Sequence, residues 1–191
     1  MSLWQLIWWS IKMPVQTPRR ERVYVLVKAY PQPSQQYDET VCCAGISEDG
    51  ERFLRLYPIP YRQLPPESRF GRFDLIEVDV FGADDFRPES CKVRSDTIKI
   101  LKKGDDLPKR EKVKLWMRFV SPSLADLEAE NRASHKSLGI IRPDPETIRF
   151  IRKSASKTSS DDQEIAESIR KQTSLFENSF QPLPRPEYAF I

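Results

Sequence analysis

Five short runs rich in β-branched and aromatic residues follow one another through the first half of the chain, joined by segments that contain Pro or Gly. Residues of these types favour strands, and Pro and Gly favour the turns between them. The predicted strands are Arg22–Tyr30, Thr40–Ser47, Arg52–Tyr57, Phe73–Phe81 and Cys91–Leu101. Because these short strands are joined by local turns, we predict a small antiparallel sheet that closes into a β-barrel.

Composition limits the class of protein. Hydrophobic residues make up 39% and charged residues 31% of the 191 residues, which is typical of a globular chain. Sixteen prolines against six glycines indicate short elements joined by stiff corners. The net charge of +3 is too small to indicate an acidic partner by itself. Three cysteines do not make a disulfide framework, so we expect reduced thiols, buried at Cys42 and Cys43, in a cytoplasmic protein.

The second and third predicted strands form a hairpin around Asp49-Gly50, a pair typical of a type I′ turn. A two-residue loop sets the facing pairs as Ile46 with Phe53, Ala44 with Arg55, and Cys42 with Tyr57. Since side chains alternate between the two faces of a strand, Leu54 and Leu56 face the core. The aromatic and arginine side chains of the same strand then face outward.

This outward face combines aromatic rings with arginine, and more arginines follow it in the sequence. Aromatic rings stack on bases and guanidinium groups pair with phosphate, so the face is a candidate surface for single-stranded nucleic acid. The candidate binding residues are Phe53, Arg55, Tyr57, Arg62, Arg69 and Arg72. The alternative is a structural role, in which Arg55 pairs with Glu77 or Asp79 on a neighbouring strand. C-terminal helices would then cover the two aromatic rings.

Two other groups of residues have side chains suited to metal ions. An acidic set that fits a metal-dependent nuclease is Asp84, Asp85 and Glu89. The lysine that follows has the spacing Glu-x-x-Lys, which turns it away from the glutamate on a strand. A zinc-binding set is Cys43, Cys91 and His135, but it lacks a Cys-x-x-Cys pair. We therefore predict no catalytic residue, no metal site and no cofactor.

The second half of the chain has a different character. A helical pattern spans residues 111–120, and Ser123 caps a second helix that we expect to end at Gly139. Two short strands flank a Pro-Asp-Pro turn at 143–145, and a polar loop at 153–164 leads into a helix from Asp162 to about Phe176. Residues 187–191 resemble a strand. We expect either that the natural protein continues beyond it or that a partner supplies its neighbouring strand.

Residues 1–21 form a predicted N-terminal extension. The first twelve residues hold three of the four tryptophans, but they are too few to span a bilayer, which takes about 20 apolar residues. They also lack the basic start and small-residue cleavage site of a secretory signal. We expect that Met13 is the true start or that the segment packs on its own domain. An interfacial amphipathic helix is the alternative.

Four motifs resemble those of a family of uncharacterised bacterial proteins. They are ETVCCAGI at 39–46, RLYPIPYR at 55–62, RPES at 87–90 and SLGIIRP at 137–143. Related proteins contain a pair of OB-type barrels, so the resemblance implies an OB-like barrel and nucleic-acid binding, and it supports no enzyme. Family members continue into a tail that contains Cys and His residues, and the present sequence stops before that tail.

These observations predict an α+β fold, with a small antiparallel OB-like β-barrel at 22–101 and a mostly helical region at 102–191. The predicted function is a non-catalytic nucleic-acid-binding or complex-forming subunit of a bacterial system. The expected partners are single-stranded nucleic acid or a protein at the C-terminal strand, and no membrane. The alternatives are a metal-dependent nuclease and a protein-interaction module that adds a strand to a partner's sheet.

Overall fold

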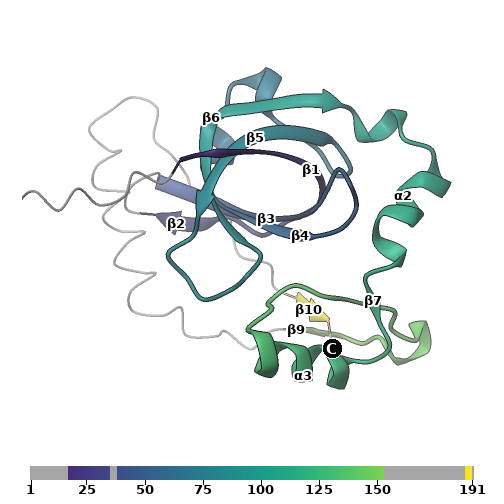
Figure 1. The fold of residues 1–191 in the computed structure, drawn as a ribbon. Coiled ribbons are helices and arrows are strands. Elements are labelled where there is room, and N and C mark those ends of the chain that lie inside the picture. Colours follow the sequence, from purple (N-terminus) through teal and green to yellow (C-terminus); the bar gives the residue numbers. More distant parts are fainter. Residues whose placement is uncertain (1–16, 35–37, 153–187, 191) are drawn as a thin grey trace, which may run out of the picture.

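The five predicted strands form a closed, ring-like sheet in the computed structural model, which describes residues 17–34, 38–152 and 188–190. The ring strands are β1 (Arg19–Lys28), β3 (Asp38–Ser47), β4 (Phe53–Ile59), β5 (Leu75–Gly82) and β6 (Ser90–Lys102). Neighbours lie in the order β1-β5-β6-β4-β3, and β1 also pairs with β3, which closes the ring (Figure 1). A short strand, β2 (Gln32–Ser34), pairs with the start of β3. All five predicted strands are confirmed, with ends that differ by a few residues.

One pairing in the ring is parallel. The other neighbours run antiparallel as expected, but β4 and β6 run in the same direction, with Leu56 opposite Cys91. The prediction of a purely antiparallel sheet is therefore wrong at this pair. The reason is the long connection at 60–74, which lets β5 pair with β1 instead of β4. Strand β6 then returns from β5 and closes the gap to β4.

Alternating side chains fill the inside of the ring with an apolar core. Its fully buried members include Val23, Val25, Cys43, Leu54, Leu56, Val78 and Val80. The connection at 60–74, with its short 3-10 helices η2 (Tyr61–Gln63) and η3 (Pro66–Ser68), closes one end of this core. Phe70 is completely buried there, and the Tyr61 hydroxyl donates a hydrogen bond to its carbonyl oxygen at 2.5 Å. The prediction that Cys43 is buried is confirmed.

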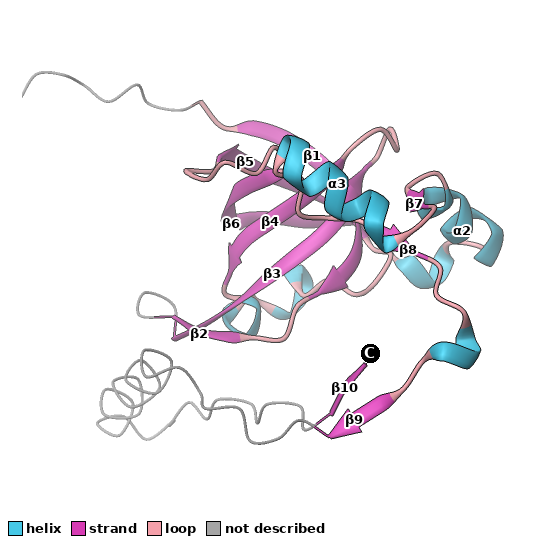
Figure 2. Cartoon of the chain, turned by 90° about the horizontal axis from the view of Figure 1, so that it is seen from below, coloured by secondary structure: helices cyan, strands magenta, loops and turns pink. Residues whose placement is uncertain are grey.

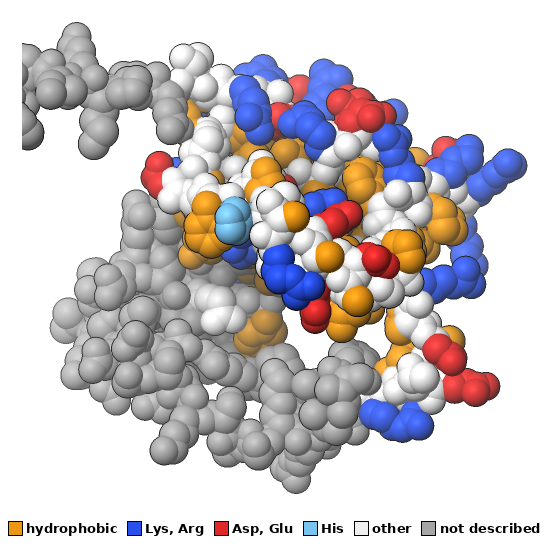
Figure 3. Space-filling view, turned by 60° about the horizontal axis from the view of Figure 1, so that its bottom comes forward, with side chains coloured by type: hydrophobic (Ala, Val, Ile, Leu, Met, Phe, Trp, Pro, Cys, Tyr) orange, Lys and Arg blue, Asp and Glu red, His pale blue; other side chains and the backbone are white. Residues whose placement is uncertain are grey.

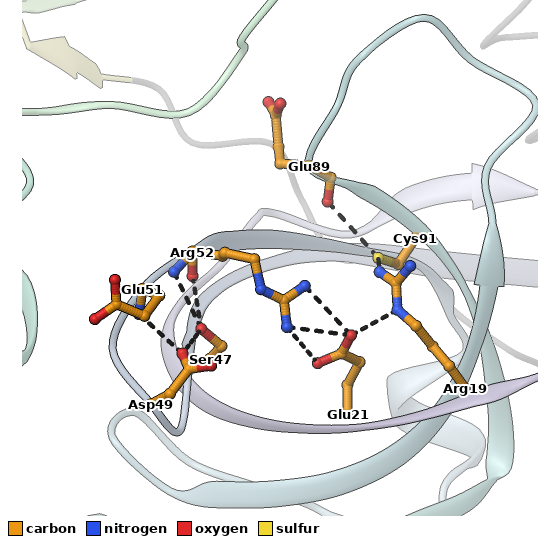
Figure 4. A network of polar contacts seen from close by, with 8 residues as sticks. All are labelled: Arg19, Glu21, Ser47, Asp49, Glu51, Arg52, Glu89 and Cys91. Atoms are coloured by element: carbon orange, nitrogen blue, oxygen red, sulfur yellow. Dashed lines mark hydrogen bonds and ion pairs between the residues drawn. The ribbon is translucent and has the colours of Figure 1, made fainter.

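The other end of the ring interior, beside the β3–β4 hairpin, is polar. Glu21 is buried and accepts hydrogen bonds from Arg19 at 2.6 Å and from Arg52 at 3.1 Å (Figure 4). Arg19 also donates to the Cys91 sulfur at 3.4 Å. Two guanidinium groups therefore hold one buried carboxylate, which gives it the charge partners that a buried acid needs.

The β3–β4 hairpin keeps the predicted register for Ile46 with Phe53 and Ala44 with Arg55. The prediction of a type I′ turn is wrong, because Gly50 has a positive φ of 72° and Asp49 does not. The Asp49 carboxylate accepts from the Ser47 hydroxyl at 2.5 Å and from the Glu51 amide at 2.9 Å, which favours a different local turn. The predicted pairing of Cys42 with Tyr57 is lost too, because the register shifts before that point.

The rest of the chain adds helices and two small sheets. In order, the elements are η4 (Gly104–Asp106), α2 (Lys109–Met117), β7 (Val120–Ser121), α3 (Leu124–Ser134), β8 (Ile140–Ile141), η5 (Pro145–Thr147), β9 (Phe150–Arg152) and β10 (Tyr188–Phe190). The Ser123 cap is confirmed, since its side chain accepts from the Asp126 amide at 3.2 Å. The stop at Gly139 is wrong: α3 ends earlier, and His135 takes the left-handed conformation with φ 59°.

The segment from α2 to β8 lies along one outer side of the ring, beside β3 and β4 (Figures 1 and 2). It buries apolar side chains that point out of the ring: Phe53 is 9% exposed, and its ring centroid lies 4.5 Å from that of Phe119. Strand β7 pairs with β8, and β10 pairs with β9 of the same chain. The fold is therefore mixed α+β, with helices after the sheet.

Some predictions concern residues outside the described part of the chain. They are the tryptophan-rich start, the polar loop at 153–164 and the helix from Asp162. Among the described helices, none has the length and apolar character needed to cross a membrane.

Candidate nucleic-acid interface

Three predicted site residues share the outer face of β4, but their surroundings differ. Phe53 is covered by Phe119, which lies between α2 and β7 and not in a helix, so the structural alternative, in which helices cover both rings, holds for neither ring as stated. Arg55 is half-buried, and Tyr57 is 48% exposed. The C-terminal segment therefore covers one end of the predicted aromatic face and leaves the ring of Tyr57 open.

Arg55 contacts the loop after α3 rather than an acidic residue of β5. Its guanidinium donates to the Ser137 hydroxyl at 3.3 Å. The predicted pairing with Glu77 or Asp79 is wrong. These two carboxylates lie on β5, next to β1, and accept hydrogen bonds at 3.0 Å from Arg22 and Arg20 respectively. Strand β4 does not pair with β5, so Arg55 has no direct neighbour there.

The four motifs of the sequence resemblance meet at this position. The Ser137 amide and hydroxyl donate to one oxygen of Glu89, at 2.6 Å and 2.5 Å. Burial raises the pKa of the Cys42 thiol, and the nearby charges of Arg55 and Arg87 act in the opposite direction. Three buried polar atoms at the junction of the β5–β6 loop with β6, Arg87 Nε, Glu89 Oε2 and Ser90 Oγ, have no hydrogen-bond partner among the described residues. The motifs thus build one polar junction between the ring and the C-terminal segment.

Two of the three acidic residues of the nuclease hypothesis, Asp85 and Glu89, have separate partners, and Asp84 is exposed. Asp85 forms an ion pair with Arg87 at 2.8 Å, and this hydrogen bond lowers the pKa of Asp85 to about 2. Glu89 binds Ser137 and points away from the ring interior (Figure 4). Of the zinc candidates, Cys43 and Cys91 belong to the ring core. The ring centroid of His135 lies 5.0 Å from that of Phe86. Within the described ranges, no three His, Cys, Asp or Glu side chains gather at a possible metal site.

The other predicted arginines lie in two places. Arg62 donates to Glu39 at 3.2 Å, and Arg69 donates to the carbonyl oxygen of Leu64 at 2.8 Å, so both have contacts within the fold around the 60–74 connection. Arg72 lies over the ring of Phe73 at 4.9 Å. It lines a pocket together with Phe53, which brings two of the six predicted residues together.

The register also forms a row of residues that sequence reasoning missed. Lys92 on β6 lies opposite Tyr57 on β4 and opposite Phe81 on β5. All three point outward, because their sequence neighbours Leu56, Cys91 and Val80 are buried inside the ring. Lys92 is exposed and Phe81 is half-buried. The side chains of these three residues form no hydrogen bond, ion pair or ring contact within the described part of the chain.

This row places a cation between two aromatic rings on three adjacent strands. The outward position of Phe81 follows from the alternation of β5, so that part was readable from the sequence. The contact between β4 and β6 was not, because it depends on the parallel pairing of strands far apart in the chain. Tyr57 is thus the predicted site residue that lies in this row, next to Lys92.

A domain of unknown function, DUF8758, matches residues 19–119, which include all five ring strands and α2. The match ends at Phe119, the residue that packs on Phe53. It covers most of the stretch on which the sequence resemblance rests. No curated protein and no solved structure matches the chain. Since the matched region is more than half of the chain, the protein belongs to the DUF8758 family.

Proposed function

We propose that this protein is a non-catalytic subunit that binds single-stranded nucleic acid in the bacterial cytoplasm, on the outer face of β4, β6 and β5. The observation that carries the proposal is the row Tyr57–Lys92–Phe81. Directly opposed residues on neighbouring strands have Cβ atoms about 5 Å apart, so the three side chains form a continuous strip. Rings stack on bases and the ammonium group pairs with phosphate, which is how sequence-tolerant single-strand sites work.

The strand order supports the further proposal that the ring is an OB-type barrel. The first three ring strands, β1, β3 and β4, are consecutive antiparallel neighbours. The third ring strand, β4, pairs in parallel with the fifth, β6. The fourth ring strand, β5, pairs with the first, β1. OB-folds have this order, and they bind oligonucleotides on the face of strands two and three and on the adjoining loops. In this chain that face is β3–β4, which adjoins the proposed row.

The charge distribution favours an anionic partner along the stretch of chain that begins at Lys92. Residues 92–118, which run from β6 through α2, contain ten Lys or Arg and four Asp or Glu, although the whole chain carries only +3. Lys and Arg side chains gather at the upper and right-hand margins of the described part in Figure 3, and α2 lies on the right in that view. Clustered cations of this kind attract phosphate and make binding depend on salt.

A labelled oligothymidylate titrated at several salt concentrations tests the proposal. We expect affinity that falls as salt rises, and Tyr57→Ala should weaken binding by about 1–3 kcal/mol if a base stacks on the ring. Lys92→Gln should reduce the slope of log affinity against log salt concentration by about 1, the value expected for the loss of one phosphate contact. The matched control is Arg142→Gln, which removes one positive charge from an exposed residue after β8, outside the 92–118 cluster. Equal losses from Lys92→Gln and Arg142→Gln would exclude the row, and absence of binding would exclude the function.

A complex-forming role is the second candidate, and exposed apolar side chains favour it. Neither α2 nor α3 contains a buried residue. Large hydrophobic residues that are 36% to 59% exposed lie along this segment: Met117, Leu124, Ile141 and Ile148. Such residues are typical of protein-contact surfaces. Salt-insensitive oligonucleotide binding together with a stable complex with another protein would favour this role over the first.

A further inference from the structure

A pocket of about 350 Å³ lies between the outer face of the ring and the C-terminal segment. Its walls come from β1, β3, β4, α2 and residues 138–141, which include β8, and the aromatic residues that line it are Phe53 and Trp116. The volume is within the range of small-molecule sites, and such sites are mostly apolar with a few polar groups.

Arg72 is the only charged residue among the described residues that line this pocket, and no acidic residue lines it. Its guanidinium has no ion pair in the described part of the chain and contacts only the face of Phe73, at 4.9 Å. A second hollow of about 310 Å³ adjoins, with Arg72, Val27 and Lys28 in its walls. The Lys28 ammonium is already bound there, to the Phe70 carbonyl oxygen at 3.1 Å. The available charge in the pocket is therefore one cation.

The backbone that carries Arg72 is held firmly. Phe73 has a positive φ of 66°, which is unfavourable for a bulky side chain and needs support from its surroundings. Its amide donates to the Val25 carbonyl oxygen at 2.6 Å, and the Val25 amide donates to the Asp74 carbonyl oxygen at 3.0 Å. Gly104 packs so closely on the Arg72 carbonyl that a side chain there would collide with it. This support fixes the backbone position of Arg72, which lines the pocket.

We infer that this pocket binds a small organic acid, with an aliphatic or aromatic body between Phe53 and Trp116 and a single anionic group against Arg72. Apolar walls favour a body without polar edges, because polar groups buried there would lose their hydrogen bonds to water. One unpaired guanidinium provides a partner for one carboxylate or phosphate. The inference does not depend on nucleic-acid binding, because the pocket shares no residue with the row Tyr57–Lys92–Phe81.

Titration calorimetry of the full chain with octanoate tests this assignment, with octan-1-ol as the uncharged match and adenosine monophosphate as a polar-bodied anion. We expect octanoate to bind at least about tenfold more tightly than octanol, since hydrogen bonds between charged groups contribute more than the free energy of a tenfold change. Arg72→Gln should remove this preference and leave octanol binding unchanged. Ala44→Leu, which fills the pocket without changing charge, should weaken both alkyl ligands.

Two control variants separate this site from the others. Arg110→Gln removes an exposed charge from α2, and Tyr57→Ala alters the proposed nucleic-acid row; neither should change octanoate affinity. Circular dichroism establishes that each variant is folded. The assignment is overturned by absence of octanoate binding, by equal affinity of Arg72→Gln and wild type, or by tighter binding of adenosine monophosphate than of octanoate.

Discussion

The guanidinium of Arg55 and the carboxylate of Glu89 hold the same side chain, that of Ser137. Arg55 donates to the Ser137 hydroxyl at 3.3 Å, and that hydroxyl and its backbone amide both donate to Glu89. Glu89 is only 6% exposed, whereas Arg55 is half-buried. The loop after α3 is therefore held against the ring mainly by its hydrogen bonds to Glu89.

We expect Glu89→Ala to destabilise the protein more than Arg55→Ala. The glutamate variant leaves two donors of Ser137 without their acceptor, which costs about 1–3 kcal/mol. The arginine variant removes a single long hydrogen bond and should cost about 0.5–1.5 kcal/mol. Urea unfolding of both variants measures the difference. A loss of about 3–5 kcal/mol for Arg55→Ala would instead indicate that the arginine neutralises a buried acid.

Glu21 should be important for stability although it is charged. Its carboxylate is buried at the polar end of the ring between Arg19 and Arg52. Glu21→Ala leaves both guanidinium groups without this partner, and we expect a loss of about 1–3 kcal/mol in unfolding free energy. Glu48→Ala is the matched control, because Glu48 is exposed and pairs with Arg22 at 3.3 Å. Surface pairs contribute about 0–1 kcal/mol, so similar losses for both would contradict the prediction.

The ionised carboxylate of Asp85 should stabilise the protein, and this contribution should be lost only at acidic pH. The hydrogen bond from Arg87 lowers its pKa to about 2. A carboxyl group with a lowered pKa contributes stability above its unfolded pKa of about 3.9 and loses it as the pH falls through the folded value. Arg87→Gln should raise the pKa of Asp85 towards the ordinary value and remove this dependence. Carbon NMR titration of the carboxyl group measures the shift, and an unchanged pKa would exclude Arg87 as its cause.

The three cysteines should react with a thiol reagent at different rates. Cys43 and Cys91 are buried in the ring, and burial raises the pKa of Cys43 to about 12. Cys42 is half-buried, on the outer side of β3. At pH 8 we expect Cys42 to be labelled first and the other two only after unfolding, because the thiolate is the reactive form. Mass spectrometry of peptides identifies the labelled residue, and rapid labelling of Cys43 in the folded protein would contradict this order.

Local patterns predicted the local structure well. Residue types in the first half predicted the strands. The alternation of side chains together with the hairpin predicted the inward face of Leu54 and Leu56 and the facing of Ile46 with Phe53. Ser123 caps its helix as its side chain allows. The predicted type of the hairpin turn was wrong because the Asp49 carboxylate accepts hydrogen bonds from Ser47 and Glu51. The Asp-Gly pair alone does not indicate these side-chain contacts.

Long-range pairings could not be predicted in the same way. No pattern within β4 or β6 indicates that they run in parallel, so the meeting of Tyr57 with Lys92 was not foreseen. The partner of Arg55 was missed for the same reason. Glu77 and Asp79 are suitable acids, but the topology places the arginines of β1 beside them. Residue type indicated which side chains need a partner, and strand order decided which partner each one has.

The closure of β1 onto β3 also affects how the protein can associate with others. An open sheet presents unpaired backbone amides and carbonyls at its edges, and these invite a further strand or aggregation. Each of the five ring strands has a partner on both sides over at least part of its length. The shortest of these contacts joins β4 to β6 through three residue pairs, so the stretch of β6 after Lys92 pairs with β5 alone. A partner that associates by adding a strand therefore has little free edge on the ring outside this stretch, and the other candidates are short strands such as β2 and those of the two small sheets.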